Sequence, residues 1–95
     1  MNQTTIQKVD VEDLALCAVN DGEIYERCGQ YCIKNLQRKV KRGIFDETKA
    51  PKLFEYLFLT LARKRYAKGI RMNREEKALF GKLVYEHYEE EIKAQ

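Results

Sequence analysis

The stretch that decides the fold is residues 50–69, which read APKLFEYLFLTLARKRYAKG. Apolar side chains recur so closely up to Ala62 that they fall on most sides of a helix. A helix of this kind lies between neighbours, because only neighbours on several sides can cover it. We therefore expect a central helix here that ends at about Lys68, just before Gly69.

The start of this helix offers two candidate N-caps, Asp46 and Thr48. With Thr48 as the cap, Pro51 falls within the first turn, where its missing N–H has no helical partner to lose. With Asp46 as the cap, Pro51 would break a helical hydrogen bond. We therefore expect a tight or 3₁₀-like opening turn.

Two helices are predicted on the N-terminal side of this segment. Asp10 is placed to cap a short helix over about residues 11–19, and Asp21 to cap a second helix that closes at Gly43. The second helix has an apolar stripe that repeats every four residues, formed by Ile24, Cys28, Cys32, Leu36 and Val40.

A fourth helix is predicted over about residues 74–93, with Asn73 and Glu76 as its capping box. Gly29 and Gly81 fall inside helices, where each costs about 1 kcal/mol relative to Ala. We expect compensation from a close approach between helices at both points. The expected inner face of the fourth helix consists of Leu79, Phe80, Leu83, Val84, Tyr88 and Ile92.

These helices and their short connections predict an all-α fold, a single-domain antiparallel bundle of one short and three long helices. The domain spans residues 1–95, with 1–9 expected to be flexible. Hydrophobic residues make up 44% of the chain and charged residues 35%, which is typical of a globular protein. The polar start holds no apolar signal-peptide core, and no apolar run approaches the ~18–20 residues of a membrane span. We expect a cytoplasmic protein with reduced thiols and no membrane partner.

The net charge is only +3, but the basic residues are clustered: 34–42 and 61–74 contain no acid. Both clusters lie at expected helix C-termini, where cations complement the helix dipole. In an up-down bundle, each of these two basic ends meets the acidic start of the other helix. The glutamate-rich end of the fourth helix would lie beside Lys39–Arg42, which leaves 63–74 as the more open basic surface.

That surface supplies the candidate interaction residues. A phosphate backbone or an acidic protein surface would suit its charge. The six tyrosines are expected at the edge of the core, although several exposed together would form a stacking platform. The candidate residues are Arg63, Lys64, Tyr66, Lys68, Arg71, Arg74 and Tyr85.

Catalytic and metal-binding patterns are weak in this chain. Cys17, Cys28, Cys32 and His87 could in principle form a zinc site, but no CxxC knuckle is present. Buried free thiols explain the cysteines better, and His87 has no nucleophile partner. We therefore expect no metal, no cofactor and no enzymatic activity.

The sequence resembles a group of small proteins from tailed bacteriophages and related mobile elements, over about residues 20–92. The resemblance implies a phage or mobile-element origin and a bacterial cytoplasm. The group has no established activity, so no functional residue is carried over. The matching segments are Asn20-Asp21-Gly22-Glu23-Ile24-Tyr25, Asn35-Leu36, Lys39 through Arg42-Gly43-Ile44-Phe45-Asp46, Phe54-Glu55-Tyr56-Leu57 and Arg65-Tyr66.

Two functional hypotheses follow from these patterns. The first is a non-enzymatic interaction module that binds a host or phage protein. The alternative is a nucleic-acid-binding accessory protein that uses the basic segment 63–74. Self-association is a further option, because the third helix carries more apolar surface than two neighbours cover.

Overall fold

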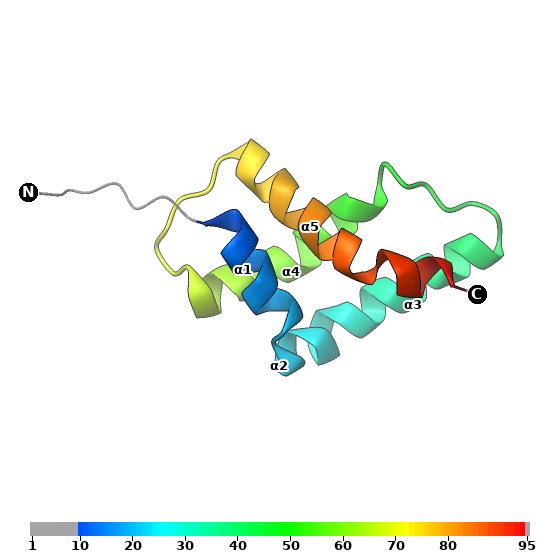
Figure 1. Ribbon diagram of the computed structural model, residues 1–95, viewed down its shortest axis with the longest axis horizontal. Coiled ribbons are helices and arrows are strands. Elements are labelled where there is room, and N and C mark those ends of the chain that lie inside the picture. Colours follow the sequence, from blue (N-terminus) through cyan, green and yellow to red (C-terminus); the bar gives the residue numbers. More distant parts are fainter. Residues whose placement is uncertain (1–9, 95) are drawn as a thin grey trace, which may run out of the picture.

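The structure, a computed structural model, describes residues 10–94, and within that range the chain forms helices and no strand (Figure 1). The predicted all-α fold of one short and three long helices is confirmed, since α2, a π-helical turn and α3 join into one long segment. The expected flexibility of 1–9 concerns residues outside the described part. The elements are α1 (Val11–Val19), α2 (Gly22–Ile24), the π turn (Tyr25–Gly29), α3 (Gln30–Lys41), α4 (Ala50–Tyr66) and α5 (Arg74–Lys93).

The helices are arranged around a crossing pair, α4 and α5. Figure 1 shows α4 running in the opposite direction to α3 and α5, while α1 lies across the pair. The end of α5 lies beside α3, where Gln37 Nε2 donates to the Glu91 carbonyl at 3.1 Å. Because α4 contacts every other helical element, it is central to the bundle, as expected.

The backbones of α4 and α5 touch at Gly81. A Cβ atom on Gly81 would lie 2.5 Å from the Pro51 carbonyl oxygen and 2.7 Å from Glu55 Cβ. Only a residue without a side chain fits there, so the predicted close approach at Gly81 is confirmed. Gly29 instead faces side-chain rings, with its virtual Cβ 2.9 Å from Tyr25 Cδ1 and 3.4 Å from Phe58 Cζ.

An aromatic cluster forms the core beneath this crossing. Phe54 stacks on Tyr88 with ring centroids 5.8 Å apart, and Phe58 lies 5.5 Å from Phe54. Burial raises the pKa of Tyr88 to about 12, because the phenolate would lose its hydration. Phe80, Val84 and Ile92 extend the buried face of α5, whereas Leu79 of the expected inner face is exposed.

The π turn was not expected from the sequence. The Gln30 N–H donates to the Tyr25 carbonyl, which takes one extra residue into the turn. In a helix of 3.6 residues per turn, a residue four positions on lies about 40° past a full turn, so a stripe of this period drifts around the helix. The wider turn offsets this drift, and both Ile24 and Cys32 are fully buried.

Most of the predicted helix ends are confirmed. Asp10 accepts from Asp13 N–H, Asp21 from Ile24 N–H, and Asn73 and Glu76 form the capping box. Gly43 has a φ of 74°, and its N–H and that of Ile44 donate back to Val40 and Lys39. This is the double hydrogen bond of a Schellman cap.

The start of α4 differs from both alternatives. Lys49 is the N-cap residue and its side chain makes no capping bond, while Pro51 lies in the first turn. Asp46 Oδ1 instead accepts from the Thr48 N–H at 2.9 Å and from its hydroxyl at 2.6 Å. The two candidate caps are therefore hydrogen-bonded to each other, and these bonds stabilise the turn that precedes the helix. At its other end α4 stops at Tyr66, two residues before the expected end, and Gly69 follows with a φ of 80°.

Replacing Gly81 with Ala tests the close approach. Helix propensity alone would make Gly81→Ala stabilising, but the added methyl group has no room and the helices must separate. We expect the free energy of unfolding to fall by about 1–3 kcal/mol in chemical denaturation. Gly22→Ala is the matched control, because no atom lies within 4 Å of its virtual Cβ. That variant should be neutral or more stable by up to about 1 kcal/mol. Equal effects in the two variants would contradict the packing described here.

Candidate interaction surface

One side of α4 faces away from the bundle. Phe54, Phe58 and Ala62 are fully buried on the inner side, whereas every fourth residue on the opposite side is exposed. Tyr56 is 79% exposed at the middle of this side. The helix α4 therefore lies between its neighbours, as expected, but one of its sides is left uncovered. We call the exposed row the outer stripe; it consists of Lys52, Tyr56, Thr60 and Lys64.

An apolar hollow of about 700 Å³ lies at the N-terminal half of the outer stripe. Its apolar lining includes Leu36 of α3, Ile44 of the connecting loop, and Leu53 and Tyr56 of α4. Ile44 is 60% exposed, because the Schellman turn carries it outward from the end of α3. The Asp46 carboxylate and three lysines also line this hollow; the lysines are Lys39, Lys49 and Lys52.

A basic hollow of about 490 Å³ lies on the other side of Tyr56. It is formed by the C-terminal half of α4, the start of the loop at Gly69, and one residue of α5. Thr60 and Tyr56 contribute hydroxyl groups, and Glu55 contributes a carboxylate. The cations that line it are Arg63, Lys64, Lys68 and Lys77.

None of the lysines of the two hollows forms a salt bridge within residues 10–94. Asp46 is hydrogen-bonded to Thr48, and these bonds, with a smaller contribution from the nearby Lys49, lower the pKa of Asp46. Unpaired cations on both sides of an exposed tyrosine give this face a positive field. Such a face attracts an acidic macromolecule.

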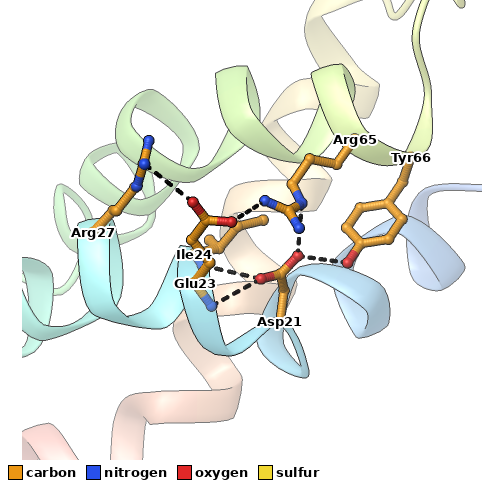
Figure 2. A network of polar contacts seen from close by, with 6 residues as sticks. All are labelled: Asp21, Glu23, Ile24, Arg27, Arg65 and Tyr66. Atoms are coloured by element: carbon orange, nitrogen blue, oxygen red, sulfur yellow. Dashed lines mark hydrogen bonds and ion pairs between the residues drawn. The ribbon is translucent and has the colours of Figure 1, made fainter.

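Beyond the basic hollow, the end of α4 is fastened to the start of α2 by a polar clamp (Figure 2). Asp21 Oδ2 accepts from the Tyr66 hydroxyl at 2.6 Å and pairs with Arg65 Nε at 3.0 Å. Arg65 also pairs with Glu23, which in turn pairs with Arg27 at 3.0 Å. The predicted meeting of the basic end of this helix with the acidic start of the preceding long helix is confirmed.

The clamp changes the protonation of its members. The hydrogen bond from Tyr66, followed by that from the Ile24 N–H, lowers the pKa of Asp21. The same hydrogen bond raises the pKa of Tyr66, because it stabilises the protonated hydroxyl. Asp21 is therefore charged at neutral pH. It joins two elements: α2, which it caps, and the last turn of α4, which it contacts through Arg65 and Tyr66.

The residues predicted to form one interaction surface lie in different parts of the structure. Arg63 donates to the Ile70 carbonyl at 2.8 Å, and Tyr66 belongs to the clamp. Tyr85 is only 4% exposed, packed 6.0 Å from Phe54, so it does not lie on a surface. Lys64 and Lys68 line the basic hollow, whereas Arg71 and Arg74 are exposed and line neither hollow.

The acidic end of α5 also differs from expectation. Lys93 pairs with Glu47 at 2.7 Å and with Glu89 at 2.8 Å, which ties this end to the loop before α4. Among the described residues, no glutamate of α5 pairs with Lys39–Arg42. Within residues 10–94, no ion pair supplies the expected neutralisation of Lys39–Arg42, and Glu47 pairs with Lys93 instead. Lys39 of α3 and Asp46 line one hollow, so this basic end does lie near the acidic residues that precede α4.

Two of the thiols, Cys28 and Cys32, are part of the core, whereas Cys17 is half-buried. Cys28 Sγ donates to the Leu57 carbonyl at 3.2 Å, and burial raises the pKa of Cys32 to about 12. All three cysteines are free, and His87 lies edge-on against Tyr88. Over residues 10–94, no three His, Cys, Asp or Glu side chains come together in a group that could hold a metal ion.

Comparisons with protein-family models, curated proteins and solved structures find no match. In the described part of the chain, no helix combines the length and apolar character needed to span a bilayer. The functional assignment therefore rests on the geometry of this chain.

Sequence reasoning missed Tyr56 as a surface residue, although a signal was present. Phe54, Phe58 and Ala62 repeat every four residues, and Lys52, Tyr56, Thr60 and Lys64 form a second such series two positions away. Two positions are about 200° around a helix. A polar series with one tyrosine, opposite an apolar series, indicates an exposed tyrosine.

The acid stability of the protein should depend on Asp21. Its folded-state pKa is lowered, so its stabilising contribution is present above the unfolded pKa and is lost as pH falls through the folded value. We expect the melting temperature of Asp21→Asn to be a few degrees below wild type at pH 7, since Asn still caps α2 but loses the charge. Between about pH 5 and pH 2 the difference should shrink. Glu90→Gln, which removes a charge outside the clamp, is the control; a constant difference between Asp21→Asn and wild type would contradict this account.

Proposed function

We propose that this protein is a non-enzymatic interaction module that binds an acidic protein through the outer stripe of α4. The observation that carries the proposal is Tyr56, 79% exposed between an apolar hollow and a basic hollow. Tyrosine is favoured at binding hot spots, because a large rigid ring gives contact area at little entropic cost. The unpaired lysines on both sides would attract the acidic partner and orient it.

The apolar hollow favours a protein as the partner. Ile44 and Leu53 are aliphatic, and a partner covers them best with apolar side chains of its own. Proteins that bind single-stranded nucleic acid rely on aromatic stacking and cations. The basic half of the face suits either class of partner, but the aliphatic half suits a protein.

Nucleic-acid binding is the second candidate function. Its support is the set of cations in 63–74 that have no acidic partner within residues 10–94: Lys64, Lys68, Arg71 and Arg74. The ring of Tyr56 could stack on a base beside Lys64. Against it, Arg63 and Arg65 are already bound to Ile70 and to the clamp.

The likeness to small phage proteins stays a prediction, and it guides the choice of material. The likeness implies a bacterial cytoplasm, and the partner that we propose is a host or phage protein. Bacterial lysates, with and without phage infection, are therefore the first source in which to look for that partner.

Capture from such lysates by the immobilised full chain tests the proposal. Wild type should retain one protein in stoichiometric amount, and Tyr56→Ser should retain at least about ten-fold less, as a hot-spot substitution does. Tyr31→Ser is the matched control, because Tyr31 is also an exposed helical tyrosine but lines neither hollow. Circular dichroism would verify that all three chains fold.

Equal capture by the three chains would show that the partner binds elsewhere. If wild type captures no protein in any lysate, the proposed protein-binding function is wrong. Capture of nucleic acid that depends on Lys64 and Lys68 would favour the second candidate.

A further inference from the structure

We propose that the partner is recognised through a bipartite segment, with an apolar anchor in the apolar hollow and a cluster of carboxylates over the basic hollow. This inference rests on the proposed function and specifies the chemistry of the partner. Tyr56 lines both hollows, so a single ligand crossing its ring reaches both. The two hollows act as one site with two chemically different halves.

The anchor half is defined by exposed aliphatic surface. Ile44 is held outward by the turn that ends α3, and Leu53 and Leu36 lie deeper in the same hollow. One or two large apolar side chains of a partner would remove this surface from water, which favours binding at any salt concentration. Lys39, Lys49 and Lys52 line the same hollow and suit an anchor that has acidic residues beside it.

The half of the site that would bind the carboxylates is defined by Lys64, Lys68 and Lys77. They come from α4, from the loop after it and from α5, and all three line one hollow. None has an acidic partner within residues 10–94, so a ligand carboxylate would not have to displace an internal ion pair. Thr60 and Tyr56 add hydroxyl donors at the same place.

The spacing of the two halves follows from the geometry of α4. Leu53 lies in the anchor half and Lys64 in the carboxylate-binding half, eleven residues apart on one helix. Along the helix axis this separation is about 16 Å, at 1.5 Å per residue. A helical partner segment would place its anchor and its acids about three turns apart. An extended segment would need only about five residues between them.

The salt dependence of binding distinguishes an acidic peptide from nucleic acid as the occupant of this site. Peptide binding that combines an apolar anchor with a few surface ion pairs should weaken less than about ten-fold between about 50 and about 200 mM salt. A phosphate backbone held by many lysines would lose roughly 10³–10⁵ in affinity over that range.

A displayed library of random peptides of about 16 residues, which span about 24 Å as helices, is the probe. The library is selected on the full chain after depletion on Tyr56→Ser. Enriched peptides should combine large apolar residues with several Asp or Glu at the expected spacing. A synthetic copy of one such peptide should bind Lys64→Glu/Lys68→Glu at least about ten-fold more weakly than wild type. Lys34→Glu/Arg38→Glu is the control, because both residues are exposed, four apart on α3, and line neither hollow.

The bipartite site would be overturned, and the proposed function left standing, by peptides whose binding depends on Tyr56 but that lack acidic residues. Peptides that bind Lys64→Glu/Lys68→Glu as tightly as wild type would have the same consequence. If no peptide depends on Tyr56 while a short thymidine oligonucleotide binds with a steep salt dependence, both are wrong. A dimer in light scattering that Tyr56→Ser dissolves would show that a second copy of this chain occupies the face, and this would also overturn the proposal.

Discussion

The crossing of α4 and α5 depends on a contact between their backbones at Gly81, where a Cβ atom would lie 2.5 Å from the Pro51 carbonyl oxygen. This approach brings Phe54 and Phe58 of α4 against Tyr88 of α5 and closes the aromatic core. It also fixes the rotation of α4 about its own axis. With Phe54, Phe58 and Ala62 turned inward, the residues about 200° away must face solvent.

Ion pairs form at the two ends of this arrangement, and the cations of its outer face take part in none of them. Asp21 holds the end of α4 through Arg65 and Tyr66, and Lys93 holds the loop before α4 through Glu47. The acids therefore stabilise the termini of the helices, where they also cap or complement the helix dipoles. Within residues 10–94, the cations along the outer stripe form no such ion pair, and they lie on both sides of the most exposed tyrosine.

Local chemistry made the helices predictable. Asp10, Asp21, Gly43 and the Asn73–Glu76 pair act where their side chains and backbone freedom suggest, since caps depend on neighbours within a few residues. Long-range pairings were less predictable. Lys93 pairs with Glu47 across the bundle, and this choice depends on distances that no sequence pattern gives. The π turn and the open side of α4 were missed for a related reason, because residue type alone does not give the rotation of a helix. Tyr56 was expected at the edge of the core and is exposed, whereas Tyr85 was expected on the interaction surface and is buried.

The central claim is that α4 is buried along its inner side and open along Tyr56 in the free protein. The most direct measurement is the broadening of the six tyrosine ring signals in the NMR spectrum by a soluble paramagnetic agent. We expect the strongest broadening for Tyr56, which is the most exposed, and the weakest for Tyr85 and Tyr88, which are buried. If Tyr56 is as protected as Tyr88 in dilute solution, α4 is rotated or covered, and the surface described here does not exist.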